Sequence, residues 1–397
     1  MNLSRRTGLA AASAMLLARS TQAAETPAVL DATLRPYLGK WNLPAIGAAV
    51  LRDGALRGVG AVGTRRVGTD IPVTVHDRFH IGSDTKAMTV LLAALTIEQG
   101  KLGWDTPIGD VLSDLPSDTN AAFRRITLTQ LMSHTSGLPG DDDEIGMLYV
   151  KAGEQDGNLD AQRRWLVAQW APKPLAGTPG KSWAYSNLGY VVLGSVLERV
   201  GGKTWEELLA TQVFDPLQLR SAGFGPQSSM GRVDAPLPHD IVDGRPIAYL
   251  AGPNADNPLV LGPAGTVHLS LLDFAAWANW QVGQGRRGPA LVSPATMKRM
   301  HSAVIEMPPQ PHAATGTPGS IQASHLAYAL GWGVATLSYA DTPFVAHSGS
   351  NGKNYAMILL QPQTDFAMVM TTNIGGPKAD EAFKALGAEL YARFMPP

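Results

Sequence analysis

Ser83 and Lys86 are the two side chains whose types and spacing could do chemistry. They lie three residues apart in Phe79-His-Ile-Gly-Ser-Asp-Thr-Lys86, where an apolar run begins that predicts a buried helix over Thr85–Gln99. Residues three apart share a helix face, so the Lys86 amine can reach Ser83 Oγ. The helix N-terminus, with unpaired N–H groups and a positive dipole end, favours a developing oxyanion and a lysine that is neutral often enough to act as a base. The pair therefore suggests an activated serine nucleophile.

The Ser-x-x-Lys pattern by itself leaves a plain structural role open, because serine commonly caps helices. It also occurs a second time, in Ser350-Asn-Gly-Lys353, between glycines and before a predicted strand. Only the first copy is followed by a long buried helix, which is the context that a nucleophile of this kind needs.

Two further motifs carry polar side chains that suit the same chemistry. Tyr185-Ser-Asn187 precedes an apolar helix predicted over Leu188–Val200, and its tyrosine could shuttle a proton while its asparagine holds Lys86 and a substrate carbonyl. A helix start with a packed tyrosine would have the same sequence. His347-Ser-Gly-Ser350 reads either as a small-residue strand edge that a substrate backbone can approach closely, or as a glycine-rich turn.

In this order, Ser-x-x-Lys, Tyr-x-Asn and His-Ser-Gly resemble the motifs of the serine β-lactamase and penicillin-binding-protein superfamily, which includes class C β-lactamases, DD-peptidases and related esterases. The resemblance extends over about residues 30–395. The further segments that carry it are Ile126-Thr-Leu-Thr-Gln-Leu-Met-Ser-His-Thr-Ser-Gly-Leu138, Pro263-Ala-Gly-Thr266, Leu272-Asp-Phe274, Tyr328-Ala-Leu-Gly-Trp-Gly333 and Asn373.

The resemblance implies a role for each residue of the three motifs. Ser83 would form an acyl-enzyme, with Lys86 and Tyr185 as base and proton relay, and the motifs leave open which of these two is the general base. Asn187 would position Lys86 and the substrate. The substrate-binding residues implied on the last motif are His347, Ser348, Gly349 and Ser350; the backbone N–H groups of Ser83 and Ser350 would form the oxyanion hole.

His347 stands where class C β-lactamases carry a lysine that attracts the substrate carboxylate. Histidine is mostly neutral at pH 7 and gains its charge near pH 6.5, so the sequence predicts a weaker carboxylate anchor that strengthens below that pH. The expected function is an acyl-serine hydrolase of a small amide or ester, such as a β-lactam, a D-alanyl peptide or a short-chain ester. The alternatives are a carboxylesterase with little β-lactamase activity and a non-catalytic penicillin- or peptidoglycan-binding relative.

The order of the predicted strands and helices indicates an α/β (α+β) fold. In this fold, an antiparallel sheet is built from both termini and is flanked by helices. A hairpin is predicted over Ala45–Val62 around Asp53-Gly54, and a second over Asn354–Thr372. The α/β part should cover about residues 24–82 and 325–397, and an inserted, mostly helical part about residues 83–324. Other helices are predicted over Glu25–Lys40, Asn158–Trp170, Thr204–Val213, Ser270–Val282, Pro294–Met300 and Lys378–Phe394, a strand over Leu330–Leu337, and loops over 223–263 and 306–320.

The N-terminus has the layout of a secretory signal. Arg5-Arg6 precedes an apolar run over Leu9–Ala18, which is too short to span a membrane, and small residues follow up to Ala23. The sequence thus predicts a signal peptide over residues 1–23, of the twin-arginine type, a mature domain over 24–397, and export, in a bacterium to the periplasm.

Composition excludes several other functions. The 397 residues are 45% apolar and 16% charged, which fits a globular chain with a sizeable core. With a net charge of −1 and no basic run interleaved with aromatics, we expect no nucleic-acid partner. The chain has no cysteine, no His-x-His-x-Asp and no Gly-x-Ser-x-Gly. We therefore expect no metal, no cofactor and no α/β-hydrolase site; the expected partner is a small-molecule or peptide substrate, and the oligomeric state stays open.

Overall fold

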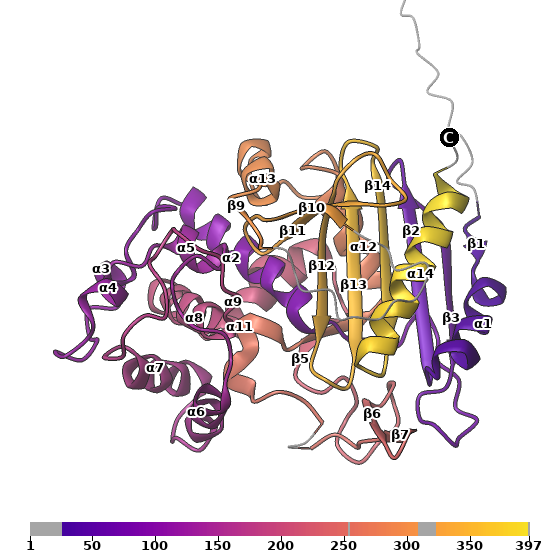
Figure 1. Ribbon diagram of the computed structural model, residues 1–397, viewed down its shortest axis with the longest axis horizontal. Coiled ribbons are helices and arrows are strands. Elements are labelled where there is room, and N and C mark those ends of the chain that lie inside the picture. The colour runs from indigo at the N-terminus through magenta and orange to yellow at the C-terminus, as the bar shows by residue number, and fades with distance from the viewer. Residues whose placement is uncertain (1–25, 253–254, 309–322, 396–397) are drawn as a thin grey trace, which may run out of the picture.

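The computed structural model describes residues 26–252, 255–308 and 323–395, and a large sheet organises them (Figure 1). Its strand order is β1-β3-β2-β14-β13-β12-β11-β10-β9, so segments from both ends of the chain meet at the β2–β14 pair. Neighbouring strands are antiparallel except β1 and β3, which are parallel. The strands are β1 Ala28–Val29, β2 Ala45–Arg52, β3 Ala55–Gly63, β9 Ile305–Glu306, β10 Ala323–Tyr328, β11 Gly333–Leu337, β12 Phe344–Ser350, β13 Tyr355–Gln361 and β14 Phe366–Thr372.

Helices cover both faces of this sheet because its central strands are apolar on both sides. Even-numbered residues of β14, such as Phe366 and Met368, pack against α1 (Asp31–Trp41) and α14 (Pro377–Phe394). Odd-numbered residues, such as Val369, join the core formed with α12 (Leu271–Val282) and the other helices. A strand buried on both faces reads as a continuous apolar run, as β14 does.

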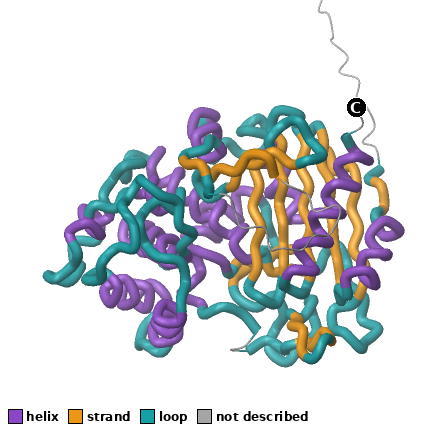
Figure 2. The backbone as a smooth tube through the Cα atoms, viewed as in Figure 1, coloured by secondary structure: helices purple, strands orange, loops and turns teal. Residues whose placement is uncertain are grey.

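The helical part lies to one side of the sheet, and Figure 2 shows it as purple helices joined by teal loops beside the orange strands, which α1 and α14 also flank. Its central element is α2 (Thr85–Glu98), which is buried along nearly its whole length and follows a 3₁₀ turn over Gly82–Asp84. Around it lie α3 Ile108–Val111, α4 Ala121–Arg124, α5 Leu128–Met132, α6 Asp143–Gly153, α7 Leu159–Trp170, α8 Asn187–Gly201, α9 Trp205–Leu209, α10 Asp215–Leu217, α11 Gly262–Gly265 and α13 Pro294–His301. Two small sheets complete the fold: β4 Arg78–His80 with β8 Val267–Ser270 and β5 Gly223–Phe224, and the hairpin β6 His239–Val242 with β7 Arg245–Ala248.

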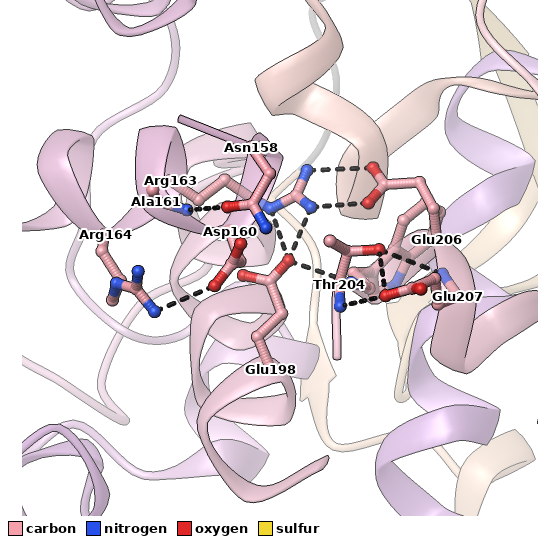
Figure 3. A network of polar contacts seen from close by, with 10 residues as sticks. Asn158, Asp160, Ala161, Arg163, Arg164, Glu198, Thr204, Glu206 and Glu207 are labelled. Atoms are coloured by element: carbon pink, nitrogen blue, oxygen red, sulfur yellow. Dashed lines mark hydrogen bonds and ion pairs between the residues drawn. The ribbon is translucent and has the colours of Figure 1, made fainter. Parts of the chain in front are cut away.

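A buried arginine connects three of these helices (Figure 3). Arg163 on α7 donates to Oε1 of Glu198 on α8 through Nε and Nη2, at 3.0 and 2.6 Å. Its Nη1 and Nη2 donate to the two carboxylate oxygens of Glu206 on α9, at 3.0 and 2.7 Å. The fork geometry of a guanidinium suits two carboxylates at once, so one side chain fixes three helices relative to one another.

Most predicted elements are confirmed within a residue or two, including both hairpins and the helix after Ser83. In the first hairpin Asp53 and Gly54 have φ of 54° and 77°, the left-handed pair that a two-residue turn of matching twist requires. Residues 28–29 were predicted helical but form β1, because their backbone pairs with β3. The loop predicted over 223–263 contains β5, β6 and β7, which are only two to four residues long and too short to give a strand pattern.

The predicted signal peptide over residues 1–23 lies outside the described residues, and the division of the chain near residues 83 and 325 stays a prediction. In the residues that the structure describes, we find no helix with both the length and the apolar character needed to cross a bilayer.

Candidate active site

Ser83 lies between a lysine and a tyrosine at the junction of the helical part and the sheet. Lys86 Nζ is 3.0 Å from Ser83 Oγ, as the three-residue spacing predicted. The hydroxyl of Tyr185, a residue that lies just before α8, donates to the same Oγ at 2.7 Å. Ser83 is half-buried while Asp84 and Lys86 are buried, so Ser83 is the residue of this turn that is partly open to solvent. The arrangement gives one oxygen two proton-transfer partners.

Lys86 is fully buried and has neutral hydrogen-bond partners. Besides Ser83, its Nζ donates to Asn187 Oδ1 and to the backbone carbonyl of Ala264, each at 2.7 Å. Burial lowers the pKa of Lys86 to about 7, although the negative charges of Asp141 and Asp84 act in the opposite direction. At neutral pH a large fraction of Lys86 is therefore uncharged and able to accept a proton.

Asp141, in the acidic run Asp141-Asp-Asp-Glu144, also belongs to the site. Its Oδ2 accepts from Asn187 Nδ2 at 2.6 Å and its Oδ1 accepts from the Tyr149 hydroxyl at 2.9 Å. The carboxylate orients the Asn187 amide so that its oxygen faces Lys86. No pattern around Asp141-Asp-Asp-Glu144 could have indicated this, because the partner lies 46 positions away along the chain.

Tyr185 is held in place by aromatic packing around His134. The two rings have centroids 4.3 Å apart, and Tyr190 and Tyr328 pack on the same histidine at 5.2 and 4.9 Å. His134 Nδ1 accepts from the backbone N–H of Ser186, and burial lowers the pKa of this histidine well below its usual value. Burial likewise raises the pKa of Tyr185, so the phenol keeps its proton at neutral pH. His134 thus packs against Tyr185 and holds the backbone just before α8.

The motif His347–Ser350 forms the second half of β12, next to the Ser83 turn. β11 pairs with Phe344–Ala346, so within the described residues no strand of the sheet pairs with the β11-facing edge of β12 beyond Ala346. Gly349 makes the close approach possible: a Cβ there would lie 1.9 Å from Ile81 O and 2.5 Å from Ser83 N. The glycine is therefore required by contact with the Ser83 turn, whereas the sequence suggested contact with a substrate.

His347 does not titrate where the sequence expected. Its Nε2 is 3.1 Å from the Tyr328 hydroxyl, its Nδ1 is 2.8 Å from Ser348 O, and the buried carboxyl of Asp84 lies 3.4 Å from the same Nδ1. Burial, together with the positive charge of Lys86, lowers the pKa of His347 to about 3. The imidazole is neutral across pH 5.5–8, which corrects the prediction of a charge gained near pH 6.5. Burial also raises the pKa of Asp84 well above its usual value.

A cleft of about 640 Å³ begins at Tyr185 and the edge of β12. Its walls are mostly apolar, and Lys384 is the only lysine or arginine among the described residues that line it. That ammonium lies 2.6 Å from Asp380 Oδ2, so its charge is already paired. The lining residues include Trp183, Met307, Leu326, Tyr328, Val334, Leu337, Tyr339, Ala346, His347, Ser348, Met357, Leu359 and Phe383.

Comparison with known proteins gives one consistent result. A family model described as Beta-lactamase matches residues 30–393. Penicillin-binding protein 4 of Amycolatopsis lactamdurans is 26% identical over 375 residues, covering 89% of this chain and 88% of that protein. Unguisins hydrolase ungD' of Aspergillus campestris is 26% identical over 349 residues, which cover 86% of this chain but 60% of that protein. The octameric penicillin-binding protein homologue from Pyrococcus abyssi superimposes with a TM-score of 0.72 at 22% identity, over 91% of this chain and 76% of that one.

Proposed function

The chain belongs to the beta-lactamase family of serine hydrolases, and from that premise we propose that it is an exported enzyme that acylates Ser83 with a small amide or ester and then hydrolyses the acyl-enzyme. The observation that carries the proposal is the position of Ser83 Oγ, 3.0 Å from Lys86 Nζ and 2.7 Å from the Tyr185 hydroxyl. A hydroxyl becomes a useful nucleophile when a base within hydrogen-bond reach takes its proton.

The direction of the hydrogen bond from Tyr185 to Ser83, together with the pKa shifts of Tyr185 and Lys86, supports Lys86 as the base of acylation. Tyr185 donates to Ser83 Oγ and keeps its own proton because its pKa is raised, whereas the pKa of Lys86 is lowered to about 7. Ser83 can then donate its proton to neutral Lys86 as Oγ bonds to the substrate carbonyl carbon. The carbonyl oxygen becomes an oxyanion at the backbone N–H groups of Ser83 and Ser350.

The second half of acylation returns the proton. The C–N or C–O bond of the substrate breaks, the leaving group takes a proton from Tyr185, and Tyr185 is reprotonated by the Lys86 ammonium. In deacylation a water molecule donates its proton to the Tyr185–Lys86 pair and attacks the acyl carbon, and Ser83 Oγ leaves with a proton. Asn187, held by Asp141, keeps Lys86 in line and can donate to a substrate carbonyl in exchange for its present partner.

The cleft supports uncharged substrates with an apolar group over carboxylated β-lactams. His347 is neutral and Lys384 is already paired, so neither offers a free charge to a substrate carboxylate. An exposed charge pair is worth about 1 kcal/mol at most, or several-fold in affinity, so this preference should be moderate. A carboxylesterase is therefore the closest alternative. A non-catalytic relative that only binds penicillin or peptidoglycan would have no need for a buried lysine at Ser83.

One experiment tests the proposal. The protein is incubated with a fluorophosphonate and with a fluorescent penicillin, and the adduct is located by peptide mass spectrometry. Turnover is measured in parallel on nitrophenyl esters of two to eight carbons, a chromogenic cephalosporin and a D-Ala-D-Ala peptide. We expect label on Ser83, none in Ser83→Ala, and better turnover of the esters.

Label on Ser350 of the second Ser-x-x-Lys, or no label from either probe, would refute the nucleophile. Label on Ser83 without turnover of any substrate would identify the non-catalytic alternative. Export is tested separately, by sequencing the N-terminus of the protein recovered from its native host; a retained Arg5-Arg6 would refute the signal peptide.

A further inference from the structure

A chain of buried polar groups runs beneath the candidate site. It begins at His80, the last residue of β4, whose Nδ1 accepts from the backbone N–H of Gly82 at 3.1 Å. His80 Nε2 lies 3.0 Å from Oδ1 of Asp256, and both side chains are at least 97% buried. Both ring nitrogens of His80 therefore have a polar neighbour, the backbone N–H of Gly82 on one side and the Asp256 carboxylate on the other. The sequence did not single out this pair, since its members lie 176 positions apart.

Asp256 connects His80 to the opposite side of the site. Its Oδ1 also accepts from Asn351 Nδ2 at 2.8 Å and from the backbone N–H of Asn257 at 2.7 Å. Burial alone would raise the pKa of Asp256, but the attraction of His80 and these hydrogen bonds outweigh it and hold the pKa below the usual value. Asn351 in turn accepts from Lys353 N through its Oδ1, and so fixes the turn between β12 and β13.

The two ends of this chain are the two backbone segments that meet beside Ser83. His80 holds Gly82, which has a φ of 51° and directly precedes Ser83; Asn351 directly follows Ser350. The segments are in tight contact, because a Cβ on Gly82 would lie 2.3 Å from Ser350 N.

We infer that His80 and Asp256 are positioning residues that set the spacing of the oxyanion hole, holding Gly82 on one side and, through Asn351, Ser350 on the other. This inference rests on the proposed function. Donors of an oxyanion hole must lie about 2.7–3.1 Å from the developing charge. A shift of a few tenths of an ångström in either N–H group therefore reduces stabilisation of the transition state more than it reduces affinity for the substrate. Hydrogen bonds to a charged carboxylate are stronger than neutral ones, which suits an anchor between two separate segments.

Two substitutions at His80 cut the chain at different links. His80→Asn keeps an acceptor near the position of Nδ1 for Gly82 N but does not reach Asp256. His80→Gln keeps a donor near the position of Nε2 for Asp256 but gives up the acceptor for Gly82. We expect each to lower kcat by about 10-fold or more with KM changed less than about threefold, the pattern of an interaction made only in the transition state.

Affinity for a phenylboronic acid distinguishes this role from a general loosening of the fold. The tetrahedral boronate on Ser83 places an oxygen in the oxyanion position, so its affinity should fall in parallel with kcat/KM. Asn351→Ala, at a half-exposed position, is the variant that should fold without difficulty and show the same split. His268→Asn is the matched control: His268 is buried, pairs with His80 in register between β8 and β4, and contacts Gly225 instead of the site.

The results distinguish a failure of the proposed function from a failure of the positioning role alone. If wild-type protein is neither acylated nor active, the proposed function fails and this role fails with it. If the wild type is active and folded His80→Gln and Asn351→Ala keep its kcat, the positioning role alone is overturned. A loss of kcat without a parallel loss of boronate affinity, or an equal loss in His268→Asn, would also overturn it. Parallel losses in the His80 and Asn351 variants, with the control unchanged, support it.

Discussion

Two buried cations, Arg163 and Lys86, show how opposite partners give opposite electrostatics in one molecule. Both side chains are fully buried. Arg163 is clamped by two carboxylates, and although burial alone would lower its pKa, Glu198 and Glu206 raise it above the usual value (Figure 3). Lys86 donates instead to a hydroxyl, an amide oxygen and a backbone carbonyl, and its pKa falls to about 7.

The difference lies in where the negative charge sits. Glu198 and Glu206 touch the guanidinium directly, so the charge of Arg163 is compensated at contact distance. Asp141 reaches Lys86 only through Asn187, and Asp84 points at His347. A directly paired cation stabilises a fold only as long as the pair is intact, whereas a cation among neutral acceptors is free to lose its proton. The residues around Arg163 hold helices together, and the residues around Lys86 are suited to proton transfer.

The largest effect should come from fixing the charge of Lys86. Arginine stays protonated at any accessible pH, so Lys86→Arg should lower turnover by about 10²-fold or more, the range for loss of a general base. Lys353→Arg, in the second Ser-x-x-Lys of the chain, is the matched control and should change turnover less than about twofold. Steady-state rates on a nitrophenyl ester measure both. A folded Lys86→Arg with wild-type activity would contradict the assignment.

Breaking the other cluster should affect stability instead. Arg163→Met leaves two carboxylates buried without their partner and should lower the free energy of unfolding by about 3–5 kcal/mol. Its neighbour Arg164, which forms an exposed pair with Asp160, is the control, and Arg164→Met should cost less than about 1 kcal/mol. Urea unfolding followed by tryptophan fluorescence measures the difference. Equal losses in the two variants would mean that the buried ion pairs of Arg163 with Glu198 and Glu206 stabilise the fold no more than an exposed pair does.

A smaller effect should appear when the charge of Asp141 is removed. This carboxylate raises the pKa of Lys86, so Asp141→Asn should lower that pKa and move the acid limb of the kcat/KM profile to lower pH. Because the loop is exposed, we expect a shift of about 0.5–1 pH unit. Asp143→Asn, at an exposed position in the first turn of α6, should leave the limb in place. A shift to higher pH in Asp141→Asn would contradict the electrostatic role.

The smallest expected effect concerns His347. Its pKa near 3 means that the imidazole carries no charge between pH 5.5 and 8. The ratio of kcat/KM for a nitrophenyl butyrate to that for a cephalosporin should therefore change less than about twofold over this range, and equally little in His347→Asn. A wild-type ratio that falls steeply below pH 6.5, with a flat ratio in the variant, would show that His347 titrates after all.

The sequence by itself determined the local features of this protein. The pairing of Ser83 with Lys86 follows from a helix repeat of 3.6 residues, and the turn at Asp53-Gly54 follows from backbone sterics; neither needs the rest of the chain. The ordered motifs, through their resemblance to a known family, also indicated Tyr185 and Asn187, which the fold brings to Ser83 and Lys86 from about 100 residues away.

Only the tertiary structure decided the charge states and the supports of the site. The carbonyl of Ala264, the carboxylate of Asp141 and the pair of His80 with Asp256 reach the site in roles that neither residue type nor spacing indicated. A pKa depends on how much water a group loses and on which charges lie within a few ångströms, and neither quantity is encoded in adjacent residues. For that reason the sequence placed a histidine at position 347 with an ordinary pKa, and the folded chain buried it beside Lys86 and kept it neutral.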